Sequence, residues 1–158
     1  MLFFSKSKDL CARYLSAFQQ TPEPFEYNGR EFDSIEAAFH YAKFLRTSCP
    51  ELADQVPSEP VSAKRFSSKK SMKELGCSLD VGRWNIESVH VMRELVQKRA
   101  LKDPKFVEII KNTGDEPLLH FERGTCNGPP FWGCFRSKET EELIGVNMFG
   151  RMLMELRY

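Results

Sequence analysis

The chain of 158 residues is long enough for one domain with its own hydrophobic core, and its composition excludes several classes of protein. Hydrophobic residues make up 41% and charged residues 28%, as in globular proteins and unlike disordered or collagen-like ones. The formal net charge of +1 excludes a global attraction to nucleic acid, so any polyanion site must be local.

The N-terminal sequence and the cysteines indicate the compartment. MLFF runs into SKSKD without a signal-peptide core, and no apolar run approaches the roughly 20 residues of a membrane helix. An odd number of cysteines without a CxxC pair argues against a disulfide framework and a zinc ribbon; they are Cys11, Cys49, Cys77, Cys126 and Cys134. We expect a monomer in the cytoplasm or nucleus, without a membrane partner, metal or cofactor.

Two segments near the N-terminus carry local signals for secondary structure. SKDLCARYLSAF, residues 7–18, predicts a short helix with Ser7 as its cap. FEYNGREF, residues 25–32, predicts a hairpin, because Asn28 and Gly29 tolerate the positive φ angles of a type I′ turn.

Residues 34–47 predict the next helix. Apolar residues recur there at helical spacing, and either Asp33 or Ser34 can cap the start. The following segment, residues 47–60, contains three prolines and predicts a connection with one helical turn after Pro50.

Residues 62–73 form the most cationic segment of the chain, without any acidic residue. Its basic residues are Lys64, Arg65, Lys69, Lys70 and Lys73. Two interpretations stay open: a solvated loop, or a local site for a diphosphate or a nucleic-acid backbone.

Two further helices are expected in the middle of the chain. The first runs from Trp84 to about Lys102 and has apolar side chains for the core, namely Ile86, Val89, Leu95 and Val96. The second starts at Asp103 and Pro104 and ends before Gly114.

The C-terminal part predicts a strand, an aromatic loop and a last helix. PLLHFE, residues 117–122, has the pattern of a strand, and residues 123–135 are a loop rich in glycine and proline. The last helix begins at about Asn147. These elements predict an α+β fold, a mainly helical single domain with a small antiparallel β-sheet.

The helix at residues 34–47 carries a carboxylate and an amine on nearly the same side. Seven residues at about 100° each place Lys43 only about 20° around the helix from Glu36, and His40 lies on the same flank. A pair of surface charges on a solvated face is one explanation. The other is chemical: burial would lower the pKa of Lys43, and a neutral amine is a nucleophile.

Several blocks of the sequence resemble the NADAR superfamily, also called YbiA-like. They are Ser34, Glu36, Phe39, Lys43 and Phe44, then Trp84, then FWG at residues 131–133, then GVNMFGRMLMELR at residues 145–157. Their order and spacing cover nearly the whole chain, so the resemblance implies one NADAR-like domain over residues 1–158.

The resemblance implies an N-glycosidase. One branch cleaves ribosylamine intermediates of riboflavin biosynthesis, and another removes ADP-ribose from guanine bases of nucleic acid. Glu36 would be the acid/base group in both. Lys43 would either form a Schiff base with the anomeric carbon or only stabilise charge beside a carboxylate-driven reaction.

Other positions are implied as substrate-binding residues: Ser34, Phe39, Trp84, Phe131, Trp132, Gly133 and Asn147. Alternatives from the residues themselves stay open. Trp132 is either a stacking platform or a core residue under its loop. Asn147 is either a plain N-cap or a site residue at a helix start whose N–H groups bind a phosphate or ribose oxygen.

Cys134 separates the two enzymatic readings. An acidic residue commonly follows the tryptophan and glycine in the riboflavin-intermediate branch. A thiol cannot replace a carboxylate as an anionic hydrogen-bond acceptor at neutral pH unless the pKa of the thiol is strongly depressed. This residue and the cationic segment favour ADP-ribosylated nucleic acid, or another ADP-ribose-type ligand, as the partner. The riboflavin intermediates are the alternative, and a binding module without catalysis is a second.

Overall fold

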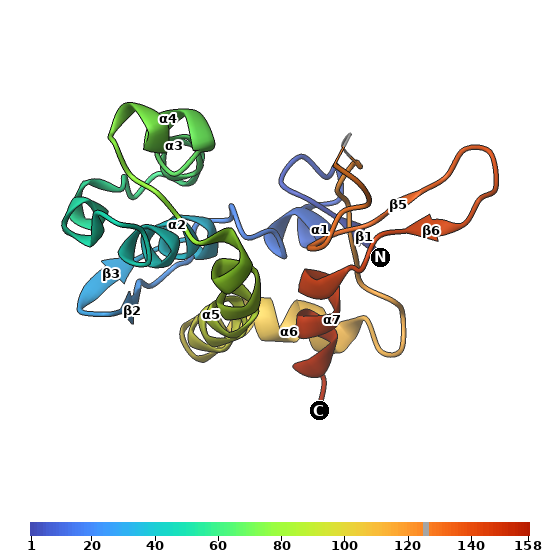
Figure 1. Ribbon diagram of the computed structural model, residues 1–158. Helices are drawn as coiled ribbons and strands as arrows, with labels where there is room; N and C mark the ends of the chain where they lie inside the picture. Colours follow the sequence, from blue (N-terminus) through green and yellow to red (C-terminus); the bar gives the residue numbers. More distant parts are fainter. Residues whose placement is uncertain (125–126) are drawn as a thin grey trace. The chain divides into compact units, whose positions relative to one another are not determined.

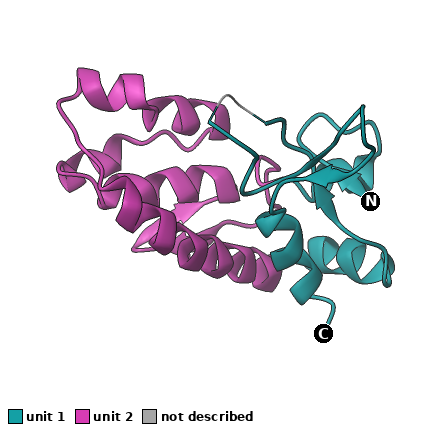
Figure 2. Ribbon diagram, turned by 45° about the vertical axis from the view of Figure 1, so that its right-hand side comes forward, with its two compact units in different colours: residues 1–16, 104–158 teal, residues 17–103 magenta. Residues whose placement is uncertain are grey.

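The computed structural model describes residues 1–124 and 127–158 and has an α+β fold (Figure 1). Cys126 therefore lies outside the described residues. Contacts divide the chain into two compact units (Figure 2). One unit consists of residues 17–103, and the other consists of residues 1–16 together with residues 104–158.

A β-hairpin lies near the start of the 17–103 unit. Strands β2 (Phe25–Tyr27) and β3 (Arg30–Phe32) pair antiparallel. Between them Asn28 and Gly29 have φ angles of 49° and 82°. The predicted hairpin and its left-handed turn are confirmed.

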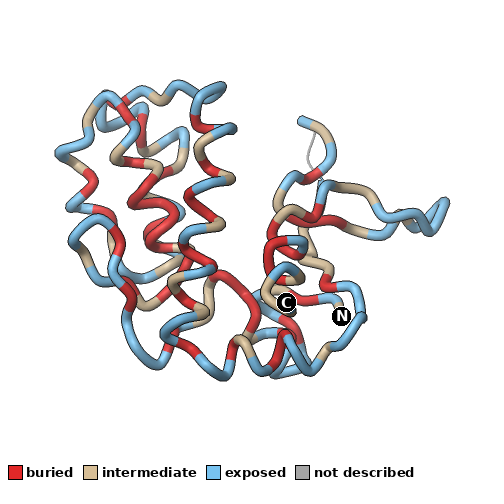
Figure 3. The backbone as a smooth tube through the Cα atoms, turned by 90° about the horizontal axis from the view of Figure 1, so that it is seen from below, coloured by how far each residue is buried: buried red, intermediate tan, exposed pale blue. Residues whose placement is uncertain are grey.

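Helix α2 (Ile35–Leu45) is the centre of this unit and confirms the predicted helix. Ser34 caps it, because its Oγ accepts a hydrogen bond from the Ala37 backbone N–H at 3.2 Å. Most residues of α2 are buried. Figure 3 colours the backbone by burial, with buried residues in red. The helix packs against α5 (Val81–Lys102), α3 (Pro60–Phe66) and the 3₁₀ helix η1 (Pro50–Gln55), which is the turn expected after Pro50.

The cationic segment is helical, so its interpretation as a loop is wrong. It forms the end of α3 and most of α4 (Lys69–Glu74). Glu59 caps α3, and Ser68 caps α4 through its Oγ. All of its basic side chains are exposed, so helical structure and a solvated surface coexist here.

Helix α5 follows Asp80, which is its N-cap. The helix buries Trp84, Val91, Met92, Leu95 and Val96. The expected core position of Ile86 is wrong, because this side chain is 69% exposed. Ile86 lies about 200° around the helix from Trp84, on the face opposite to the core.

In the second unit, strand β1 (Leu2–Phe3) pairs with β4 (Leu119–His120) in parallel, so the sheets are not purely antiparallel as expected. Helix α1 (Leu10–Tyr14) is capped by Asp9. Ser7, the expected cap, instead accepts a hydrogen bond from the Phe4 backbone N–H at 2.8 Å.

The remaining elements of this unit are α6 (Pro104–Asn112), the β5–β6 hairpin (Phe135–Arg136 and Leu143–Ile144) and α7 (Met148–Glu155). Their core consists of fully or nearly fully buried side chains: Phe3, Phe106, Ile110, Leu118, Phe149 and Leu153. Across the described part of the chain, every helix is too short or too polar to span a membrane.

Candidate functional site

Glu36 and His40 form a sheltered carboxylate–imidazole pair on α2. They stand one turn apart, on the same face of the helix. Glu36 Oε1 lies 2.8 Å from His40 Nε2, and the two side chains are only 13% and 9% exposed. The second oxygen, Oε2, has no hydrogen-bond partner among the residues that the structure describes.

Ser67 extends this pair to a chain of three groups. Its side chain is fully buried in the turn between α3 and α4, and its Oγ is hydrogen-bonded to His40 Nδ1. An ionised Glu36 only accepts hydrogen bonds, so His40 Nε2 carries the proton. In the neutral imidazole, Nδ1 then accepts from the Ser67 hydroxyl.

Lys43 contacts the same serine through the backbone. Its Nζ donates to the Ser67 carbonyl oxygen at 3.0 Å. Burial lowers the pKa of Lys43, and the positive charge of Lys69 lowers it further. Glu36 opposes both effects, but the net pKa is below the ordinary value of 10.5.

The amine and the carboxylate are therefore near enough to interact electrostatically, and both are sheltered. A pair of exposed charges on a solvated helix face does not fit this arrangement. A lowered pKa increases the fraction of neutral amine at a given pH, which is the form that attacks an electrophilic carbon.

Two aromatic residues and one hydroxyl of the proposed site lie in the same unit. The Phe39 ring lies 5.2 Å from the Trp84 ring and 5.6 Å from the His40 ring, measured between centroids. Both Phe39 and Trp84 are 8% exposed. Ser34 is buried as the cap of α2. Substrate binding by these three residues stays a prediction.

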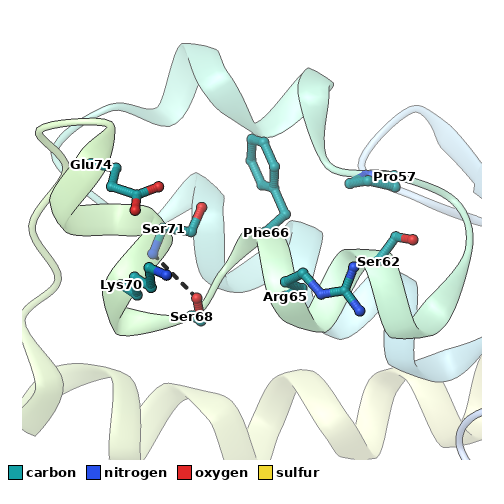
Figure 4. Close-up of a pocket in the computed structure, with 8 residues that line it drawn as sticks. All are labelled: Pro57, Ser62, Arg65, Phe66, Ser68, Lys70, Ser71 and Glu74. Atoms are coloured by element: carbon teal, nitrogen blue, oxygen red, sulfur yellow. Dashed lines mark hydrogen bonds between the residues drawn. The ribbon is translucent and has the colours of Figure 1, made fainter.

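The described residues of this unit line at least two cavities, and neither lining includes Glu36 or Lys43. The first, of about 360 Å³, lies between α3 and α4 and is lined by Pro57, Ser62, Arg65, Phe66, Ser68, Lys70, Ser71 and Glu74. Figure 4 shows these residues and the hydrogen bond from the Ser71 N–H to Ser68 Oγ at 3.2 Å. The second, of about 290 Å³, is lined by Leu45, Arg46, Thr47, Leu79, Asp80, Arg83, Trp84 and Glu87.

The loop that carries Phe131 and Trp132 belongs to the other unit. The two rings meet edge-on with centroids 4.9 Å apart; Phe131 is 39% exposed and Trp132 is half-buried. The carbonyl groups of both residues accept hydrogen bonds from the N–H groups of Met148 and Phe149 in the first turn of α7. This occupies two of the N–H groups that the sequence left available for a phosphate or ribose oxygen, and binding of a substrate at this helix start stays a prediction.

Gly133 fills a position that allows no side chain. A Cβ atom there would lie 2.6 Å from the His120 carbonyl oxygen and 2.5 Å from Glu122 Cβ. The Gly133 carbonyl oxygen accepts a hydrogen bond from the Asn147 N–H at 3.0 Å. The geometry therefore gives Gly133 a structural role, and substrate binding by it stays a prediction.

Asn147 precedes α7 but does not cap it with its side chain. The residue has a φ of 55° and is 7% exposed. Its Oδ1 accepts from the His120 N–H and its Nδ2 donates to the Leu118 carbonyl oxygen, both at 2.9 Å. The amide thus connects the start of α7 to strand β4, and the plain N-cap interpretation is wrong.

Cys134 is 1% exposed, and burial raises the pKa of its thiol despite the opposing charge of Arg136. The side chain is consequently a neutral thiol at physiological pH. It does not supply the anionic acceptor that an acidic residue would place here.

The sequence did not identify Ser67 and Lys69 as parts of the site, and it placed His40 only on the flank of the helix. His40 could have been found from its spacing of four residues from Glu36. Ser67 depends on a tertiary contact 27 residues away in the chain, for which no local pattern exists. Within the described residues, no cluster of three or more histidine, cysteine, aspartate and glutamate side chains is arranged to hold a metal ion.

Comparisons with known proteins bear on the family and the fold of the chain. The NADAR domain model matches residues 3–158. The N-glycosidase Npun_R5314 of Nostoc punctiforme is 29% identical over 107 residues, which span 66% of this chain and 56% of that protein. The match thus covers only about half of the relative's length.

A solved structure shows the same fold. The NMR structure of the E. coli protein YbiA superposes with a TM-score of 0.67 at 22% identity, over 99% of this chain and 83% of that one. Because the family model spans both compact units, from the first strand to the last residue, the chain belongs to the NADAR domain family.

Proposed function

We propose that this chain is an N-glycosidase that removes ADP-ribose from guanine bases of nucleic acid. One observation carries the proposal: α2 holds a sheltered carboxylate whose Oε2 is left for a substrate, beside an amine whose pKa is lowered. The name of the Nostoc relative, an N-glycosidase, supports the reaction class.

In the proposed reaction the sugar ring opens, so that the anomeric carbon is doubly bonded to the guanine amino nitrogen. The neutral Lys43 amine adds to that carbon. The Glu36 carboxylate takes the two protons of the attached amine nitrogen in turn and passes each to the guanine nitrogen. The bond between carbon and guanine then breaks, guanine leaves with its amino group restored, and a neutral Schiff base to Lys43 remains. The Glu36 carboxylate takes one proton from water as the water oxygen adds to the Schiff-base carbon, and it passes this proton to the Lys43 nitrogen. It then transfers the proton of the new hydroxyl group to the same nitrogen. The sugar then leaves as an aldehyde, and both side chains return to their starting states.

A second mechanism uses the same residues differently. Glu36 would act alone on an oxocarbenium-like carbon, and Lys43 would only stabilise charge. The lowered pKa of Lys43 favours the first mechanism, because charge stabilisation requires a protonated amine and gains nothing from a lowered pKa.

The substrate class rests on the cavity between α3 and α4. Its lining combines Arg65 and Lys70 with three serine hydroxyls and one carboxylate, Glu74. Cations and hydroxyl donors suit the diphosphate of ADP-ribose or a nucleic-acid phosphate. The neutral Cys134 thiol speaks against the riboflavin intermediates, whose branch commonly has an acidic residue there.

The test is a parallel assay of the purified chain on an oligonucleotide with ADP-ribosylated guanine and on the ribosylamine intermediates of riboflavin biosynthesis. We expect release of ADP-ribose, detected by mass spectrometry, and its loss in Glu36→Gln. Cleavage of the ribosylamines alone would overturn the substrate assignment. Binding of ADP-ribose without turnover of either substrate would identify a binding module instead.

A further inference from the structure

Ser67 contacts both groups of the proposed catalytic pair, through two different atoms. Its hydroxyl is hydrogen-bonded to His40, which in turn holds Glu36, and its carbonyl oxygen accepts from Lys43. The residue is 0% exposed, so bulk water does not replace either contact. One turn, between α3 and α4, therefore meets both reactive groups.

We propose that His40 and Ser67 are positioning residues, which fix Glu36 and Lys43 in one reactive arrangement without contacting the substrate. This inference rests on the proposed function, because it assigns a role relative to the same acid/base and amine groups.

The argument for Glu36 follows from its two oxygens. Oε1 is committed to His40 Nε2 at 2.8 Å, which fixes the carboxylate rotamer and leaves Oε2 to exchange the proton with the substrate. The hydrogen bond requires the proton of His40 on Nε2, and the Ser67 hydroxyl selects that tautomer by donating to Nδ1. Without this hydroxyl, the proton can move to Nδ1, and a bare Nε2 would then face the Glu36 carboxylate.

The argument for Lys43 follows from the geometry of an amine. A neutral amine has two hydrogens and one lone pair, and it donates one hydrogen to the Ser67 carbonyl oxygen at 3.0 Å. This contact directs the lone pair away from the turn. The same buried turn thus orients the carboxylate through its side chain and the amine through its backbone.

The experiment measures kcat and KM for release of ADP-ribose from the ADP-ribosylated oligonucleotide, well below the melting temperature of each variant. We expect Ser67→Ala to lower kcat about 10- to 100-fold with KM changed less than about twofold, because misplaced reactive groups slow the chemical step rather than binding. Ser88→Ala is the matched control. It removes another buried hydroxyl of the same unit, bonded to the Asn85 carbonyl oxygen, and should leave kcat unchanged.

Two substitutions of His40 separate packing from hydrogen bonding. His40→Phe keeps a ring without donors and should lower kcat as Ser67→Ala does. His40→Gln supplies an amide N–H for Glu36 and should restore most of kcat. An independent readout is the ¹⁵N NMR spectrum of the imidazole of His40, which should show a proton on Nε2 in the natural chain and a mixture of tautomers in Ser67→Ala.

The outcomes are distinguishable. If Ser67→Ala keeps its kcat within twofold and the Nε2–H tautomer, while Glu36→Gln is inactive, the positioning role is wrong and the proposed function survives. If the natural chain releases no ADP-ribose, or Glu36→Gln is as active as the natural chain, the proposed function is wrong and this inference with it.

Discussion

The starts of α2 and α7 place polar residues of the NADAR pattern in opposite situations. Ser34 caps α2, so the Glu36 side chain in the first turn of the helix is not needed as a cap, and only its Oε1 is held, by His40. At α7 the side chain of Asn147 uses its donor and its acceptor to bind the backbone of Leu118 and of His120 in β4. Both residues are sheltered from solvent, but only Glu36 keeps an atom for a substrate.

The comparison teaches how to separate chemistry from architecture within one family pattern. Burial alone does not distinguish the two residues. The distribution of hydrogen bonds does, because a group with all its polar atoms bonded to backbone stabilises the fold, whereas a group with one oriented and one unbonded oxygen is prepared for proton transfer.

The largest expected effect concerns Glu36. Glu36→Gln keeps an oxygen that accepts from His40 but cannot exchange a proton, so the rate of ADP-ribose release should fall by about 10² or more. The melting temperature should stay within about 2 °C of the natural chain, because the contact with His40 is kept. An unchanged rate would mean that Glu36, like Asn147, has only a structural role.

Asn147→Ala should act on stability. It leaves the Leu118 carbonyl oxygen and the His120 N–H buried without partners, which costs about 2–5 kcal/mol in the free energy of unfolding. Asn112→Ala, an exposed asparagine of the same unit, is the control and should change it by less than about 0.5 kcal/mol. Urea unfolding measures both. A stability loss no larger than the control's would mean that the amide is available for another purpose.

A smaller effect is expected from Lys69. Its charge lowers the pKa of Lys43, so Lys69→Met should raise that pKa toward the ordinary 10.5. Activity that depends on the neutral amine rises with pH as Lys43 loses its proton, and this rise should move to higher pH in the variant. Lys73→Met, at the far end of α4, should leave the pH profile unchanged. A profile that responds equally to both variants would contradict the assigned charge interaction.

The smallest effect belongs to the cap of α2. Ser34→Ala removes the hydrogen bond to Ala37 and should cost about 1 kcal/mol in the free energy of unfolding, while Ser34→Asp should retain most of it. A loss of activity in both variants, without loss of stability, would instead support the substrate-binding role that the family resemblance implies.

The sequence predicted those parts of the fold that depend on local signals. The turn at Asn28 and Gly29 and the apolar spacing in α2 are such signals, and both elements appear where they were expected. The parallel pairing of β1 with β4 joins residues more than 100 positions apart. No local sequence pattern predicts such a pairing. Ile86 shows the same limit within a helix, since only tertiary packing selects which face of α5 is buried.

The candidate site divides in the same way. The spacing of Glu36 and Lys43 predicts that they share one side of a helix, and the family resemblance implies their catalytic roles. The cationic segment attracts attention through its charge, whereas its hydrogen bonds to the site come from Ser67, an uncharged residue between two short helices. The composition of the loop at residues 131–133 predicts ligand binding, but its carbonyl oxygens accept hydrogen bonds from N–H groups at the start of α7.

The central claim, that Lys43 and Glu36 act together on one anomeric carbon, is tested most directly by reductive trapping. The natural chain is incubated with the ADP-ribosylated oligonucleotide and borohydride, and the peptide that contains Lys43 is analysed by mass spectrometry. The account predicts a reduced ADP-ribose adduct on Lys43, present only when substrate and borohydride are combined. Continued release of ADP-ribose without any adduct on Lys43 would contradict it.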